Sequence, residues 1–242
     1  MNIRTAMDDV QALATGASLA DVAKLQAWFS PSFPVGAFNY SHGLEWAVEA
    51  GDVRTAASLR AWIEGVLRFG SGRSDAIIVC ATWRAVRSRD WSTACEISSL
   101  AAALQPTAER RMESVGQGNA FLGAVSAAWP HPVLQHFRES CPGETALPVS
   151  VGAAAAAHGL PLEPVLVAFL HAFAANLVSA GVRLVPLGQT DGLKVIAALE
   201  AAILEVTDKA VRAGIEDLGS AGILADIASM RHETQYTRLF RS

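Results

Sequence analysis

The residues best suited to bind a metal ion are six histidines spread along the chain. They are His42, His131, His136, His158, His171 and His232. None forms the HxxxH or HExxH spacing, or a Cys/His cluster with the spacing of a structural zinc site. His232-Glu233 begins like a zinc-protease motif, but Tyr236 stands where the second histidine would be. The sequence therefore predicts no metal site and no cofactor, although separate histidines could converge in space.

Two further patterns could indicate a functional site, but neither matches the motif of that site. The segment 188–194, GQTDGLK, lacks the GxxxxGK[ST] order of a phosphate-binding loop and follows no strand, so it reads as a turn with a helix cap. There is no GxSxG nucleophile elbow. Ser41 and His42 are adjacent, so on a helix they point in different directions, and Glu45 is a capping or surface group. We therefore expect no catalytic residue, with an enzyme whose site is assembled from distant residues as the alternative.

Composition limits the class of protein. Half of the 242 residues are hydrophobic, 17% are charged, and the net charge is -4, which predicts no general affinity for nucleic acid or an anionic membrane. The three cysteines, Cys80, Cys95 and Cys141, are odd in number and far apart, so we expect reduced thiols in a cytoplasmic protein. The N-terminus has no apolar segment typical of a secretory signal.

One apolar stretch, residues 165–182, is long enough to be considered as a membrane span. His171, Asn176 and Ser179 interrupt it, and its many alanines contribute little to insertion. A helix that is apolar all round, buried centrally or at a subunit interface, is the better interpretation.

The elements that must position these residues are helices. Ala, Leu and Glu dominate, and runs of Val, Ile, Thr or Tyr with period two are missing, which favours an all-α fold. We predict a single-domain bundle of about ten helices: a flexible tail over 1–20, a helical domain over 21–230 and a C-terminal tail over 231–242. The predicted helices cover 21–29, 38–50, about 58–69, 75–88, 91–104, 106–128, 147–158, 163–180, 192–207 and 217–230.

Local signals predict where several helices begin. Thr55 or Ser58 is expected to cap the third helix, and Pro106 to be the first residue of the helix over 106–128. Thr190 or Asp191 is expected to cap the helix over 192–207. Residues 129–146 are expected to form a break and a loop.

Three segments are unusual for a plain helical bundle. They are FPVGAFNYSHGLE at 33–45, VPLGQTDG at 185–192 and MRHETQYTRLFRS at 230–242. Together and in this order they resemble the UreF family of urease accessory proteins, and the resemblance covers nearly the whole chain. It implies a homodimeric, all-α protein without catalytic activity that acts as a chaperone in urease maturation. Family members bind the accessory protein UreD, also called UreH, recruit the GTPase UreG, and so help to pass nickel to apo-urease.

The resemblance also implies roles for particular residues. The C-terminal tail is expected to become ordered on binding UreD/UreH and to shape the platform for UreG. Arg238 matches the tail arginine of the family, with Thr237 in place of a serine, and Phe38 stands at an aromatic position that is often tyrosine. The expected partner-binding residues are Phe38, Arg231, His232, Glu233, Tyr236, Arg238, Leu239 and Phe240. The expected platform or structural residues are Pro34, Gly36, Ser41, Gly43, Glu45, Gln189 and Asp191.

Physical chemistry offers two interpretations of the tail. Tyr236, Leu239 and Phe240 are large apolar groups that could pack on their own domain. They could instead anchor a partner, because aromatic and arginine side chains dominate interface hot spots. The arginines make this segment basic within an acidic protein, which could steer an acidic partner surface. The 33–45 and 185–192 segments, likewise, could serve only to turn the chain or cap a helix.

Overall fold

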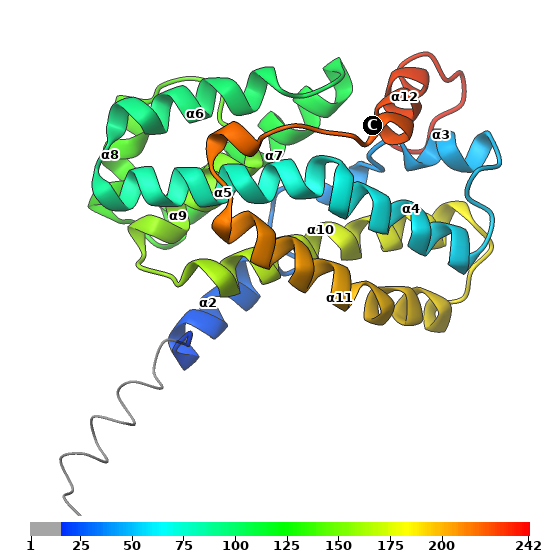
Figure 1. The fold of residues 1–242 in the computed structure, drawn as a ribbon, viewed down its shortest axis with the longest axis horizontal. Coiled ribbons are helices and arrows are strands. Elements are labelled where there is room, and N and C mark those ends of the chain that lie inside the picture. The colour runs from blue at the N-terminus through cyan, green and yellow to red at the C-terminus, as the bar shows by residue number, and fades with distance from the viewer. Residues whose placement is uncertain (1–15) are drawn as a thin grey trace, which may run out of the picture.

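The structure, a computed structural model, describes residues 16–242, which fold as the predicted all-α bundle (Figure 1). These residues form eleven α-helices and two short 3-10 helices, and no strand. The elements are α2 (Leu19–Trp28), η1 (Ala37–Asn39), α3 (Leu44–Glu49), α4 (Ala56–Phe69), α5 (Ser71–Ser88), α6 (Trp91–Ala103), α7 (Ala108–Ala128), α8 (Pro132–Ser140), α9 (Leu147–Ala157), α10 (Leu162–Leu184), α11 (Gln189–Arg212), η2 (Ile215–Asp217) and α12 (Ile223–His232).

The first described helix begins inside the segment expected to be a flexible tail. Ser18 caps α2, because its side chain accepts a hydrogen bond from the backbone N–H of Asp21 while the Asp21 carboxylate accepts from the Ser18 backbone. Most of the expected tail, residues 1–15, lies outside the described residues.

Helix α5 is the centre of the bundle and packs against α4, α6, α9, α10 and α11 (Figure 1). The alanine-rich helix α9 lies against it, with every residue from Pro148 to Ala157 buried. A Cβ on Gly152 would lie 2.7 Å from the carbonyl oxygen of Val79. Small side chains in α9 therefore allow two backbones to approach closely in the core.

Helix α10 is the one helix of the described residues that is long and apolar enough to cross a membrane. It packs against α11, α4, α5 and α3, and half of its most apolar window is buried within the chain. These contacts are those of a core helix in a bundle.

The predicted helix caps were partly wrong. Thr55 caps α4 as expected. Helix α7 begins at Ala108 rather than at Pro106, and Thr107 caps it, since its side chain accepts from the N–H of Arg110. Helix α11 begins at Gln189, with Gly188 in the cap position. Thr190 and Asp191 therefore lie in its first turn, where an acidic side chain suits the positive end of the helix dipole.

The continuous helix predicted over 38–50 is also wrong. The chain forms η1, breaks at Ser41–Gly43 and resumes as α3. His42 and Gly43 have φ angles of 61° and 77°, which end a right-handed helix. The cause is tertiary, because the backbone N–H of Ser41 donates to the carbonyl oxygen of Ser242 at the far end of the chain.

A helix and a covalent bond were not predicted between residues 91 and 146. Helix α8 occupies part of the predicted loop, with Pro132 in its first turn. Cys95 and Cys141 form a disulfide with a Cα–Cα distance of 5.1 Å, so the expectation of three reduced thiols is corrected for this pair. Cys80 is a free, buried thiol, and burial raises its pKa to about 12.

Candidate functional site

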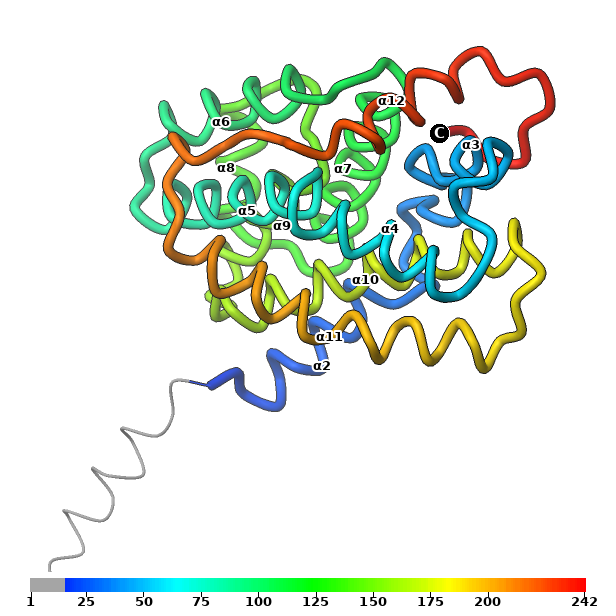
Figure 2. The backbone as a smooth tube through the Cα atoms, turned by 45° about the vertical axis from the view of Figure 1, so that its right-hand side comes forward, coloured from blue at the N-terminus to red at the C-terminus, as the bar shows by residue number. Residues whose placement is uncertain are grey.

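The C-terminal tail folds back over the segment that joins η1 to α3. The backbone N–H of Arg241 donates to the carbonyl oxygen of Asn39 at 2.8 Å, and that of Ser41 donates to the carbonyl oxygen of Ser242 at 2.8 Å. Figure 2 shows this last part of the chain beside α3, with α12 close by, and α12 also packs on α3. Two segments that the sequence separates by about two hundred residues thus form one surface.

Glu45, in the first turn of α3, holds this arrangement together. Its buried carboxylate accepts hydrogen bonds from the backbone N–H groups of Leu239 at 2.6 Å and Phe240 at 2.9 Å. The same carboxylate lies 3.1 Å from Nε2 of His232. A carboxylate is a strong acceptor for main-chain N–H groups, so Glu45 is an attachment point for the tail. From its spacing after Ser41 it was expected to be a capping or surface group, and from the resemblance a platform or structural residue.

His232, at the end of α12, bridges two carboxylates. Its Nδ1 lies 2.6 Å from Glu109, and Nε2 lies against Glu45. A neutral imidazole has one N–H, so both contacts are hydrogen bonds only if the ring, or one carboxyl group, carries an additional proton. Arg238 adds a positive charge by donating to Glu109 at 2.7 Å. The side chains of α3, α7, α12 and the tail thus form one connected polar cluster.

The remaining hydrogen bonds of α12 and the residue after it are with the start of α7. Glu233 accepts from the backbone N–H groups of Ala108 at 2.9 Å and Glu109 at 3.3 Å, which satisfies two free donors at a helix N-terminus. The hydroxyl groups of Thr107 and Ser229 lie 2.8 Å apart. Glu233 is therefore a helix cap supplied from a distant segment.

The aromatic residues Phe38 and Phe240 meet on the guanidinium of Arg183. Its Cζ lies 3.7 Å from the centroid of the Phe38 ring and 4.4 Å from that of Phe240. The same side chain donates to the carbonyl oxygen of Phe38 at 3.1 Å. Nothing in the sequence marks Arg183, which lies on α10, because the two rings that it joins come from opposite ends of the chain.

A second buried cluster lies beneath the last residue. The hydroxyl of Ser242 donates to Glu113 at 2.6 Å, and Arg110 forms an ion pair with the same carboxylate. Burial alone would raise the pKa of Glu113, but Arg110, the nearby His42 and the bond from Ser242 outweigh it and hold that pKa at about 2. Burial, helped by Arg110, lowers the pKa of His42 to about 4.

This second cluster contains the elements of a Ser–His–carboxylate arrangement, which bears on the enzyme alternative. His42 Nε2 lies 2.6 Å from the hydroxyl of Ser71. The other ring nitrogen, Nδ1, lies 3.7 Å from Glu113, too far for a hydrogen bond. Glu113 is moreover engaged by Arg110 and Ser242, so it does not orient the imidazole as a catalytic triad requires.

The other residues singled out in the sequence lie in different environments. Gly36 adopts φ 73° before η1, Pro34 is exposed, and a Cβ on Gly43 would lie 2.8 Å from the backbone nitrogen of Ser229. Gln189 and Asp191 lie at the start of α11, where Asp191 pairs with Lys194. Within residues 16–242, no hydrogen bond or ion pair joins these two residues to the tail.

The tail also presents side chains to the outside. Tyr236 is fully exposed and Leu239 is 65% exposed, while Phe240 is buried. Arg231 is exposed on α12. Among residues 16–242, no group of three or more His, Cys, Asp or Glu side chains is placed to hold a metal ion. Buried polar contacts thus hold the tail in place, while Tyr236, Leu239 and the nearby Arg231 are exposed to the outside.

Comparison with known proteins identifies the family. Residues 53–200 match the UreF family model. Urease accessory protein UreF of Rhodopseudomonas palustris (strain BisB5) is 52% identical over 223 residues, which cover 92% of this chain and 92% of that protein. The chain belongs to the UreF family. The proteins of the same name from Bradyrhizobium sp. (strain ORS 278) and Xanthobacter autotrophicus are 48% and 52% identical over 233 and 218 residues, covering 96% and 90% of this chain and 97% and 90% of their own length.

Membership of the UreF family supports an accessory role in urease maturation, since the relatives are named urease accessory proteins. The family-model match runs from just before α4 into α11. The tail and the 33–45 segment, which build the site described above, lie outside it.

Proposed function

We propose that this chain is a non-catalytic scaffold for urease maturation whose C-terminal tail docks a second accessory protein. That protein is UreD/UreH, and the resulting complex recruits the GTPase UreG and delivers nickel to apo-urease in the cytoplasm. A homodimer of this chain is the working unit. The observation that carries the proposal is the tail itself, which is held from below by Glu45 and Glu109 while Tyr236 and Leu239 face outward.

The physical argument is one of preorganisation. An exposed tyrosine and leucine on a segment that already has a fixed backbone can bind a partner without the full entropic cost of ordering that segment. Aromatic and arginine side chains are the commonest hot spots at protein interfaces, and Arg231 lies on the adjacent helix. The resemblance implies that the tail becomes ordered on binding UreD/UreH, whereas the isolated chain already places it on Glu45.

The experiment is co-purification of UreD/UreH and UreG with variants of this chain. Truncation after Met230 removes the partner-facing residues, but it also removes the groups that satisfy Glu45, so a point variant is more informative. Tyr236→Ala combined with Leu239→Ala removes only exposed side chains. Leu204→Ala, at a position 57% exposed on α11, is the matched control.

We expect the double variant to lose the complex and the control to retain it. Assembly of the double variant at wild-type levels would mean that the tail is not the docking element. Failure of the folded wild-type chain to assemble with either protein would contradict the scaffold function as a whole.

A further inference from the structure

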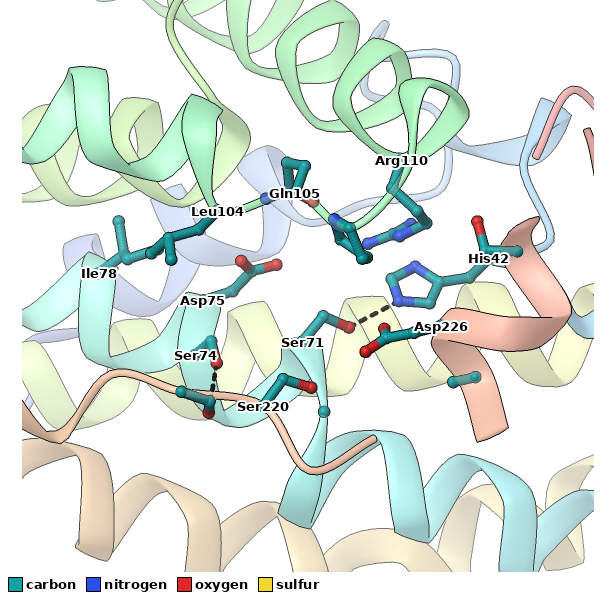
Figure 3. Close-up of a pocket in the computed structure, with 15 residues that line it drawn as sticks. His42, Ser71, Ser74, Asp75, Ile78, Leu104, Gln105, Arg110, Ser220 and Asp226 are labelled. Atoms are coloured by element: carbon teal, nitrogen blue, oxygen red, sulfur yellow. Dashed lines mark hydrogen bonds between the residues drawn. The ribbon is translucent and has the colours of Figure 1, made fainter. Parts of the chain in front are cut away.

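A small cavity, lined in part by His42, lies between α5, α12 and the connection from α6 to α7. Its volume is about 110 Å³. Its polar lining residues include Ser71, Ser74, Asp75, Ser220 and Asp226 (Figure 3). The contacts of the tail described above do not involve these carboxylates.

Asp75 is the unusual group in this cavity. It is 91% buried, since 9% of its surface is exposed, and Figure 3 shows its carboxyl group directed into the cavity. Within residues 16–242 its carboxyl group forms no hydrogen bond and no ion pair. Buried carboxylates are ordinarily paired or hydrogen-bonded, because burial of an isolated charge is costly. An unpartnered acid at this position therefore points to a group that the isolated chain does not contain.

The cavity is lined by two carboxyl groups, those of Asp75 and Asp226, and by one arginine. Burial raises the pKa of Asp75 to about 7, and burial also raises that of Asp226. The one lysine or arginine among the lining residues, Arg110, is already paired with Glu113. His42 carries no positive charge near neutral pH, because its pKa is lowered to about 4.

The lining also defines the chemistry of a ligand. Carboxylates and serine hydroxyl groups are acceptors, so they suit a group that carries several N–H donors and a positive charge. Two carboxylates do not make a metal site, and none of three or more ligands occurs among residues 16–242. A volume of about 110 Å³ admits the head group of a lysine or arginine side chain but not a large organic ligand.

The surroundings of the cavity indicate where such a side chain would come from. Leu104, which lines it, is 43% exposed. Helix α12, which supplies Asp226, also exposes Ile223 and Leu224, at 64% and 72%. Leu104 at the cavity and exposed apolar side chains on the helix that supplies Asp226 match a protein surface on which a basic residue has apolar neighbours, since apolar contacts around a charged pair exclude water.

We propose that the cavity at Asp75 and Asp226 receives a lysine or arginine side chain of a protein partner, whose apolar neighbours pack on Leu104 and on α12. This inference rests on the proposed scaffold function, in which the chain meets other accessory proteins. The contact is separate from the tail, so it provides a second point of attachment. An arginine fits best, because its planar guanidinium can donate to a carboxylate and to neighbouring hydroxyl groups together.

The test begins with small probes on the intact chain. Propylguanidinium chloride and propylammonium chloride are titrated against isotope-labelled protein, and amide shifts are followed at Ser74, Asp75 and Asp226. We expect saturable shifts at these residues. Asp75→Asn should weaken binding at least about tenfold, because it removes the charge that is buried with the ligand. Glu49→Gln, at an exposed glutamate on α3, is the matched control and should bind as wild type does.

Three results would overturn the inference. They are the absence of saturable shifts in the wild-type chain, equal binding by Asp75→Asn, and displacement of the probes by magnesium chloride at equal concentration, which would make the cavity a metal site. Asp226→Asn is the second variant, and thermal unfolding verifies that both are folded.

The same variants separate this inference from the scaffold function. If wild type and folded Asp75→Asn co-purify with UreD/UreH and UreG equally well, the cavity is not a partner site, and the scaffold function stands. If the wild type assembles with neither, the scaffold function fails, while the probe titration still reports on the cavity.

Discussion

Replacing Glu45 by glutamine tests whether one buried carboxylate holds the C-terminal tail in place. The carboxylate accepts from the N–H groups of Leu239 and Phe240 and contacts His232. A hydrogen bond to a charged group contributes about 1.5–3 kcal/mol. Glutamine keeps one acceptor oxygen but turns an NH₂ group toward at least one of these donors. Loss of one to two such bonds should therefore cost about 2–4 kcal/mol.

The assay is amide hydrogen exchange at Leu239 and Phe240, because these two protons are the ones that Glu45 accepts. If the tail opens locally, 2–4 kcal/mol corresponds to exchange that is about 30- to 1000-fold faster at these sites. Amides in the core helix α9 should change less. Glu49→Gln, on the exposed side of the same helix, should leave all of these rates unchanged. Unaltered exchange at Leu239 and Phe240 in Glu45→Gln would refute the assignment of Glu45 as the attachment point.

Three further substitutions test other parts of the structure. Burial raises the pKa of Asp75 from 3.8 to about 7, so the folded chain binds a proton that the unfolded chain releases, and wild-type stability falls as the pH rises through that window. The free energy of unfolding of Asp75→Asn, measured in urea, should therefore rise relative to that of wild type by up to about 4 kcal/mol as the pH increases from about 4 to about 7. A difference between the two that does not change with pH would count against this reasoning. Gly43→Ala should destabilise the chain by about 2–3 kcal/mol in urea unfolding, since its Cβ would lie 2.8 Å from the Ser229 nitrogen at a positive φ; a wild-type midpoint would show that α12 moves aside freely. Arg183→Met should loosen the tail by about 1–2 kcal/mol in the exchange assay through loss of the cation over the Phe240 ring, whereas Arg183→Lys should retain part of that contact, and identical behaviour of the two variants would contradict a role for the charge.

The helical class and most helices of this chain are predictable from sequence because they depend on local signals. Thr55 caps α4 as its position indicates, and the apolar spacing of Leu59, Ile63 and Val66 places their side chains in the core. The failures have a common cause. The helix predicted over 38–50 is broken where Ser41 pairs with Ser242, and the sequence near residue 41 does not show that pairing.

The candidate site was likewise predictable from the sequence only in part. The motifs that resemble the UreF family contain Glu45, His232, Arg238 and Phe240, and the structure brings all four residues into one cluster. It places Gln189 and Asp191 at the start of α11 without any bond to the tail within residues 16–242. Arg183 belongs to none of the motifs, although it joins two of them.

Sequence by itself thus determined the secondary structure class, the family resemblance and the residues that are chemically capable of forming a polar cluster, because these depend on composition and on short-range order. Only the tertiary structure decided which carboxylate meets which donor. Glu45 lies near Glu49 in sequence, yet one is buried against the tail and the other is exposed. The same holds for Asp75, whose unpaired burial depends on α5, α12 and the loop before α7 meeting around one cavity. Burial and partner choice are set by segments far apart in the chain, and for this reason they appear only in the folded protein.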